Sequence, residues 1–164
     1  MNDSVMVEPV DITRYSAEIT HLLRRSFDGV AKTMGLTREN CPNHVAFLSE
    51  DRLLAQLAHP QAHCLGIRDN GGWVGFVAVA PYRGDYEITR LAVAPECRHR
   101  GYGSALIDHA CAVAKTLGLE EIGLGMIYEN TVLLKWYEAL GFAASQPFRL
   151  PGVPYTICAM SKRL

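Results

Sequence analysis

The chain is predicted to form a mixed α/β fold, in which helices cover a mixed sheet of antiparallel and parallel strands. The middle of the sequence alternates apolar runs with turn residues, which is typical of antiparallel strands, whereas the last third alternates helix-like and strand-like segments. Its 164 residues, 49% hydrophobic and 20% charged, are typical of a globular protein, and no repeat or linker divides them. We therefore expect a single domain over residues 1–164.

The N-terminal third is predicted to be helical after a short apolar start at residues 5–10. Apolar side chains recur at helical spacing over residues 12–27, which predicts an amphipathic helix. The turn-rich stretch 33–47 has no clear period and is expected to be mostly loop. Ser49 can then cap a second, leucine-rich helix, which Pro60 should end.

Antiparallel strands are predicted from residue 63 onward. Two apolar runs flank the Asn-Gly-Gly sequence at residues 70–72, which is a strong signal for a hairpin. Turn residues at 81–85 then precede a third strand at residues 86–93. These segments together predict an antiparallel meander in the middle of the chain.

The last third is predicted to contain two helices and two strands. A helix with apolar residues at spacings of four and three should end at Gly118. A strand is expected at residues 122–128, a helix at 131–140 closed by Gly141, and a final strand at 155–162.

A glycine turn, RHRGYGSAL at residues 98–106, separates the third strand from the next helix. The first N–H groups of a helix lack intrahelical partners and carry partial positive charge, so they can bind a phosphate. Gly101 and Gly103 would let the backbone approach that phosphate, and Arg98 and Arg100 could add charge-assisted hydrogen bonds. The same spacing also suits a plain loop with solvated arginines, because an isolated G-x-G is a weak motif.

The segment ITRLAVAPECRHRGYGSALIDHA resembles the acetyl-CoA-binding core of the GNAT superfamily of N-acetyltransferases. The signature of that family, Q/R-x-x-G-x-G/A after an apolar strand, is matched by Arg98, Gly101 and Gly103. A second segment, ENTVLLKWYEALGF at residues 129–142, resembles the family's Asn, helix, Tyr and closing Gly-Phe. The resemblance covers residues 62–145 and implies a GNAT fold, with a central, mixed and mostly antiparallel sheet of about seven strands flanked by about four helices. It also implies acetyl transfer to a primary amine by direct attack in a ternary complex.

The resemblance also implies that acetyl-CoA is the co-substrate and indicates how it binds. Main-chain N–H groups of residues 98–104 would hold the pyrophosphate, and the pantetheine arm would lie where the strands at 86–93 and 122–128 splay apart. Asn130 would contact the arm from the far side, although it also fits a simple helix cap. The residues implied in cofactor binding are Leu91, Ala92, Val93, Arg98, His99, Arg100, Gly101, Tyr102, Gly103, Ser104 and Asn130.

Two catalytic residues follow from the same resemblance. Glu87 matches a glutamate found at the start of this strand in several relatives and is the expected general base. A carboxylate of ordinary pKa is a weak base for an ammonium group, so we expect either a raised pKa or a water that relays the proton. Tyr137, seven residues beyond Asn130, is the expected general acid at the departing thiolate. The alternatives are that Glu87 is a solvated strand residue and that Tyr137 packs in the core.

The acceptor is open between a small-molecule amine and a peptide or protein amine, with polyamines, aminoglycosides and amino acids all compatible. Ordinary surface residues are the favoured interpretation for the candidate acceptor-side residues, which are Tyr82, Arg83, Asp85, Asn40, Asn43 and His44. The chain could also be a non-catalytic CoA-binding sensor, or use another acyl-CoA. A homodimer is possible.

Several functions are not expected from the composition. A net charge of −1 and a pI near 6.6 give no electrostatic reason to expect nucleic acid or a membrane as partner. No leader or membrane-spanning segment is recognised, so we expect a cytoplasmic protein. Histidines such as His99 and His109 lack ligand spacing, and we expect no metal. Free thiols are expected at Cys41, Cys64, Cys97, Cys111 and Cys158.

Overall fold

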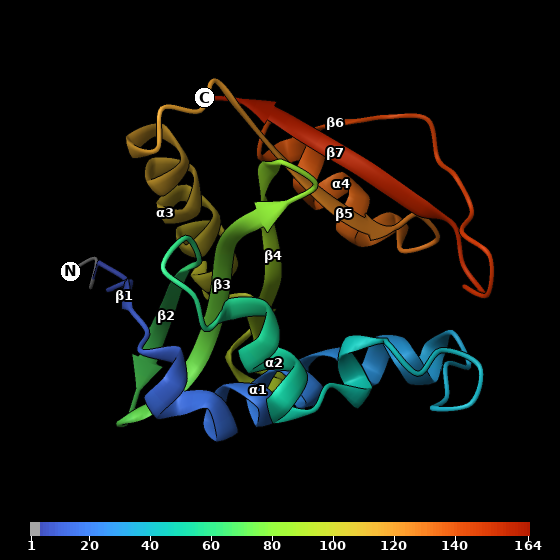
Figure 1. Cartoon of the computed structure of the whole chain (residues 1–164), viewed down its shortest axis with the longest axis horizontal. Coiled ribbons are helices and arrows are strands. Elements are labelled where there is room, and N and C mark those ends of the chain that lie inside the picture. Colours follow the sequence, from blue (N-terminus) through green and yellow to red (C-terminus); the bar gives the residue numbers. More distant parts are fainter. Residues whose placement is uncertain (1–3) are drawn as a thin grey trace.

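A computed structural model describes residues 4–164 of the chain. Within these residues, seven strands form one sheet in the order β1-β2-β3-β4-β5-β7-β6 (Figure 1). Neighbouring strands are antiparallel except β4 and β5, which are parallel, so the predicted mixed and mostly antiparallel sheet is confirmed. The strands are β1 (Glu8–Pro9), β2 (His63–Asp69), β3 (Gly72–Tyr82), β4 (Asp85–Val93), β5 (Glu121–Ile127), β6 (Ala143–Ala144) and β7 (Ile157–Arg163).

In the described part of the chain, four α-helices cover the two faces of the sheet. They are α1 (Ile12–Thr33), α2 (Glu50–Leu57), α3 (Tyr102–Thr116) and α4 (Thr131–Ala139), with single 3₁₀ turns η1 (Val45–Phe47) and η2 (Pro95–Cys97). Two adjacent residues of β3 show that each face of the sheet has its own core. Val77 packs in a core with α3, whereas Phe76 points to the opposite face and packs in a core with α1 and α2. Tyr137 of α4 belongs to the α3 core.

The first helix is longer than the sequence predicts. Asp11 caps its start by accepting a hydrogen bond from the N–H of Arg14 at 3.2 Å. The predicted end at residue 27 is wrong, because the buried Ala31 continues the apolar stripe four residues beyond Phe27. The last turn also carries an ion pair between Asp28 and Lys32 at 2.7 Å.

Both predicted hairpins form, through two-residue turns with positive φ. Asn70 and Gly71 have φ of 50° and 82°, and Arg83 and Gly84 have 49° and 83°, as expected for tight turns between twisted strands. β3 continues through Pro81, where the sequence predicts a turn. Pro81 fits in the strand because β2 has already ended on that side, so no strand there requires its missing N–H.

The C-terminal elements lie within two residues of their predicted bounds. Gly118 and Gly141, with φ of 80° and 95°, follow the ends of α3 and α4 as expected. The two-residue strand β6 was not predicted, because two residues are too short to show a pattern. It pairs with β7 in the same sheet.

Candidate active site

The two parallel strands meet at one point and then separate. Glu87 of β4 pairs with Gly123 of β5, and no other pair between these strands occurs in the part of the chain that the structure describes. On its other side, a Cβ on Gly123 would lie 3.3 Å from the carbonyl oxygen of Met160, so glycine allows the close approach of β5 to β7. Beyond this point β4 and β5 diverge (Figure 1), and a cavity of about 380 Å³ lies between them.

A bulge in β4 shapes one wall of this cavity. Arg90 has φ of 59°, and the register of β4 against β3 shifts at the same place. In a regular strand alternate residues face opposite sides, but the bulge lets Thr89, Arg90 and Leu91 all border the cavity. Left-handed backbone at an arginine is costly, which indicates that the surrounding structure holds it there.

The start of α3 has the geometry expected for an anion site. Gly101, with φ of 81°, precedes the helix without any side-chain cap. Among the described residues, no group accepts a hydrogen bond from the backbone N–H groups of residues 99–104. Six donors and the positive end of the helix are therefore available to a phosphate.

The two arginines of the glycine turn have partners within the protein, and its two glycines are required for different reasons. The Arg98 guanidinium donates to the Ser26 carbonyl at 2.7 Å, and Arg100 lies 3.8 Å from an Asp69 carboxylate oxygen. A Cβ on Gly103 would lie 3.1 Å from the Trp136 ring, whereas one on Gly101 would meet nothing within 4 Å. Gly101 is thus required by its φ, and Gly103 by packing between α3 and α4.

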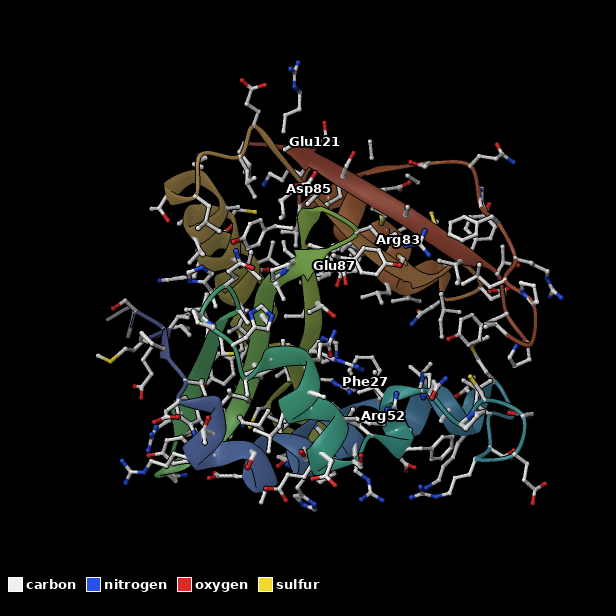
Figure 2. All side chains as sticks on the ribbon, viewed as in Figure 1. Phe27, Arg52, Arg83, Asp85, Glu87 and Glu121 are labelled. Carbon is white, nitrogen blue, oxygen red and sulfur yellow. The ribbon has the colours of Figure 1, made fainter. Side chains whose placement is uncertain are left out.

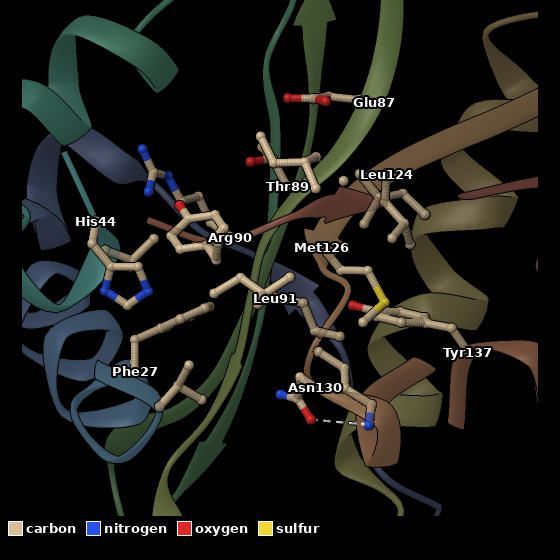
Figure 3. Close-up of a pocket in the computed structure, with 18 of the residues that line it drawn as sticks. Phe27, His44, Glu87, Thr89, Arg90, Leu91, Leu124, Met126, Asn130 and Tyr137 are labelled. Atoms are coloured by element: carbon tan, nitrogen blue, oxygen red, sulfur yellow. Dashed lines mark hydrogen bonds between the residues drawn. The ribbon is translucent and has the colours of Figure 1, made fainter. Parts of the chain in front are cut away.

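Glu87 is half-buried on β4 and borders the cavity. Figure 3 shows its carboxylate at one end of the cavity, on the same strand as Thr89 and Arg90. Burial raises the pKa of this carboxyl above its ordinary value, and the positive charges of Arg90 and Arg83 partly oppose that shift. A raised pKa makes the carboxylate a stronger base.

Tyr137 lies on the opposite wall, with its hydroxyl pointing into the cavity beside Met126 (Figure 3). The side chain is only 6% exposed, and its ring packs edge-on against Trp136 and Phe142 at centroid distances of 5.0 and 5.6 Å. Burial strongly raises the pKa of the phenol, so the hydroxyl keeps its proton. Tyr137 therefore packs in the core, as the alternative interpretation of this residue expects, and its hydroxyl still reaches the cavity.

Asn130 caps α4 and borders the same cavity. Its Oδ1 accepts a hydrogen bond from the Leu133 N–H at 3.2 Å, so the helix-cap interpretation is confirmed. The amide nitrogen makes no hydrogen bond to any residue in the described range. A contact with a cofactor stays a prediction for this side chain.

The acceptor-side candidates are only partly brought together. Tyr82 and His44 border the cavity, whereas Asn40 lies in a turn, where it bonds to Thr37. Figure 2 shows Arg83 and Asp85 at the β3–β4 turn, across from Phe27 and Arg52 on the side of α1 and α2. The carbonyl of Asn43 accepts a hydrogen bond from Arg52. Sequence reasoning did not select Thr89, Arg90 or Tyr155, which also border the cavity.

Other groups were checked for metal, disulfide and membrane roles. All five cysteines are free and buried, as expected. Over residues 4–164, no cluster of three or more His, Cys, Asp or Glu side chains could hold a metal ion. None of the described helices is both long enough and apolar enough to cross a bilayer.

Comparison with known proteins identifies the family. The Acetyltransferase (GNAT) family matches residues 19–142, so the chain belongs to this family. The fold also matches solved N-acetyltransferases at low sequence identity. A search of curated proteins found no match.

Three of these structures illustrate the similarity. The PaiA N-acetyltransferase of Thermoplasma acidophilum, solved with coenzyme A, has a TM-score of 0.78 at 20% identity, covering 98% of this chain and 99% of that one. The ribosomal-protein-S18-alanine N-acetyltransferase of Escherichia coli has a TM-score of 0.75 at 16% identity, covering 98% and 94%. An aminoglycoside 6'-N-acetyltransferase solved with coenzyme A has a TM-score of 0.71 at 17% identity, covering 96% of each chain.

Proposed function

We propose that the chain is an acetyl-CoA-dependent N-acetyltransferase that acetylates a primary amine by direct attack in a ternary complex. The observation that carries the proposal is the cavity between β4 and β5, which has the half-buried Glu87 on one wall and the Tyr137 hydroxyl on the other. A base and an acid facing one space, in a chain of the GNAT family, fit amine deprotonation and thiolate protonation.

The chain offers a binding surface of suitable shape for acetyl-CoA, which would supply the activated acetyl group. The unpaired N–H groups of residues 99–104 suit its pyrophosphate. Leu91 and Asn130 border the gap between the strands, where an extended pantetheine arm could use main-chain groups left free by the divergence. The coenzyme A complexes of PaiA and of the aminoglycoside acetyltransferase support this choice of ligand.

Glu87 is proposed as the general base. An amine reaches the cavity largely protonated at neutral pH and must lose that proton before attack. The raised pKa of Glu87 increases its basicity, while Arg90 and Arg83 keep it ionised enough to accept a proton, directly or through water.

Tyr137 is proposed as the general acid. Its buried phenol stays protonated, and the hydroxyl makes no hydrogen bond to any described side chain or carbonyl. A free O–H can donate to a sulfur that gains negative charge. The packing against Trp136 and Phe142 holds the ring in one orientation, which keeps that donor aimed into the cavity.

The proposal is tested by measuring free thiol released from acetyl-CoA with a broad panel of amines. We expect amine-dependent release, and loss of at least about a hundredfold in kcat for Glu87→Gln. The matched control is Glu121→Gln, because Glu121 lies exposed at the start of β5 and does not border the cavity (Figure 2). Tight coenzyme A binding without transfer to any amine would indicate a sensor instead. Turnover only with another acyl-CoA would show that acetyl-CoA is not the donor.

A further inference from the structure

The wall of the cavity near α1 and α2 carries an arginine whose terminal amino groups have no hydrogen-bond partner in the described chain. The Nε–H of Arg90 donates to Oε1 of Gln56 at 2.9 Å, which fixes the plane of the guanidinium. Its two terminal amino groups donate to no acceptor within the described chain. The side chain is partly buried and borders the cavity, so this is a positioned cation with free hydrogen-bond donors.

His44 presents a second donor to the same space (Figure 3). Its Nδ1 accepts a hydrogen bond from the Ala46 N–H at 3.2 Å. A backbone N–H is always the donor, so the proton of the neutral ring must be on Nε2. Burial and the charge of Arg90 lower the pKa of His44, which favours that neutral form. The ring is only 6% exposed, and its Nε2–H donates to no described group.

Among the described residues, no carboxylate makes an ion pair with Arg90. Glu87 and Arg90 are the only Asp, Glu, Lys or Arg side chains among the described residues that border it. Arg52, held by the carbonyls of Pro42 and Asn43 at 3.4 and 3.1 Å, adds further positive charge near Arg90. A partly buried guanidinium with no directly paired anion is costly, and a carboxylate matches its planar pair of donors.

We propose that the acceptor amine also carries a carboxylate, which the terminal nitrogens of Arg90 and the Nε2–H of His44 bind while Glu87 receives the amine proton. This inference rests on the proposed function and names its substrate class, a zwitterion such as an amino acid or a short peptide. The acceptor's positive end faces the anionic Glu87 and its negative end faces the cationic wall. A polyamine would instead bring a second cation against Arg90 and is disfavoured.

The test compares acceptors that differ only in the carboxylate. Leucine with leucinamide and β-alanine with β-alaninamide are the matched pairs, and spermidine represents the polyamines. For the wild-type protein we expect kcat/KM to be about tenfold or more higher for the carboxylates. In Arg90→Asn this preference should be lost, mainly through a raised KM. Asparagine is chosen because it tolerates the positive φ at this position.

The ratio of preferences between wild type and variant removes the intrinsic difference in amine reactivity within each pair. Arg149→Asn, in an exposed loop, is the control for loss of one positive charge and should keep the preference. His44→Gln, which retains a side-chain N–H, is the second variant and should weaken the preference less than Arg90→Asn. Thermal melting and acetyl-CoA affinity of each variant establish that it is folded.

The two proposals fail in different ways. Equal or faster acetylation of the amides or of spermidine would overturn the carboxylate subsite and leave the transferase intact. An unchanged preference in folded Arg90→Asn would do the same. No transfer to any acceptor, with acetyl-CoA bound, would overturn the proposed function and the inference with it.

Discussion

Replacing Tyr137 with phenylalanine removes one hydroxyl from the cavity and leaves the ring contacts with Trp136 and Phe142 in place. Because the hydroxyl has no hydrogen-bond partner among the described residues, its loss leaves no buried group unpaired. The free energy of unfolding should therefore change by less than about 1 kcal/mol. The substitution separates a chemical role for the hydroxyl from the packing role of the ring.

The expected effect on the reaction is much larger. A positioned general acid contributes about 10²–10⁴-fold, equivalent to about 2.7–5.4 kcal/mol of activation free energy at about 1.36 kcal/mol for each tenfold. We expect Tyr137→Phe to lower kcat by about a hundredfold or more, with little change in acetyl-CoA affinity. Because burial strongly raises the phenol pKa, the wild-type rate should also show no loss from tyrosine ionisation up to about pH 10.

The assay combines steady-state kinetics, calorimetric titration of acetyl-CoA and thermal melting of each variant. Tyr128→Phe is the matched control, because Tyr128 follows β5 directly but is 42% exposed and does not border the cavity. A kcat for folded Tyr137→Phe within twofold of wild type would refute the acid role and leave Tyr137 as a core residue only.

Three further predictions concern the carboxylate, the glycine turn and the cap. Ionising a carboxyl with a raised pKa costs folding free energy at neutral pH, so Glu87→Gln should melt at an equal or higher temperature than wild type at pH 7. Calorimetry should show that the gain in melting temperature disappears below the ordinary glutamate pKa, where both proteins are neutral at this position. A lower melting temperature for Glu87→Gln than for wild type at pH 7 would contradict the raised pKa of Glu87. Gly103→Glu should weaken acetyl-CoA binding at least about tenfold, because it adds negative charge at the unpaired N–H groups and its side chain collides with the Trp136 ring. If calorimetric titration gives an affinity within a few-fold of wild type, these N–H groups do not bind the pyrophosphate. Asn130→Ala should cost about 1 kcal/mol and about 2–4 °C in Tm through loss of the helix cap, and Asn130→Ser should restore most of that stability. Weaker acetyl-CoA binding in both Asn130 variants would indicate a direct contact, and unchanged binding in both would assign Asn130 to the cap alone.

Elements with strong local signals were predicted well from the sequence. The Asn-Gly turn at residue 70, the Ser49 cap and the glycines that follow α3 and α4 each act over a few residues, so the sequence contains their cause. The end of α1 was wrong because Ala31 is a weak apolar signal, and its burial depends on the loop packed against it. Local pattern cannot report such long-range packing.

The site was predictable to the extent that short motifs mark it. The signature around Gly101 located the unpaired N–H groups, and the spacing to Tyr137 selected a hydroxyl that borders the cavity. Arg90 was missed because a single positive φ turns its side chain toward the cavity, and nothing in the letters ITRLAV marks a bulge. His44 was found only as a general candidate, because its role as a donor depends on a tautomer that the Ala46 N–H fixes.

Arg98 shows how a residue of the binding signature can act through the fold. Its guanidinium donates to the carbonyl of Ser26 in α1, and the Ser26 hydroxyl lies 3.3 Å from the carbonyl oxygen of Val93. One residue earlier, Arg25 makes two hydrogen bonds of 3.0 Å to Glu96 in η2. These contacts tie α1 to the chain on both sides of η2, which leads into the glycine turn. The N-terminal helix therefore helps to set the loop conformation that leaves the α3 N–H groups free, and the binding geometry depends on residues about 70 positions away in the sequence.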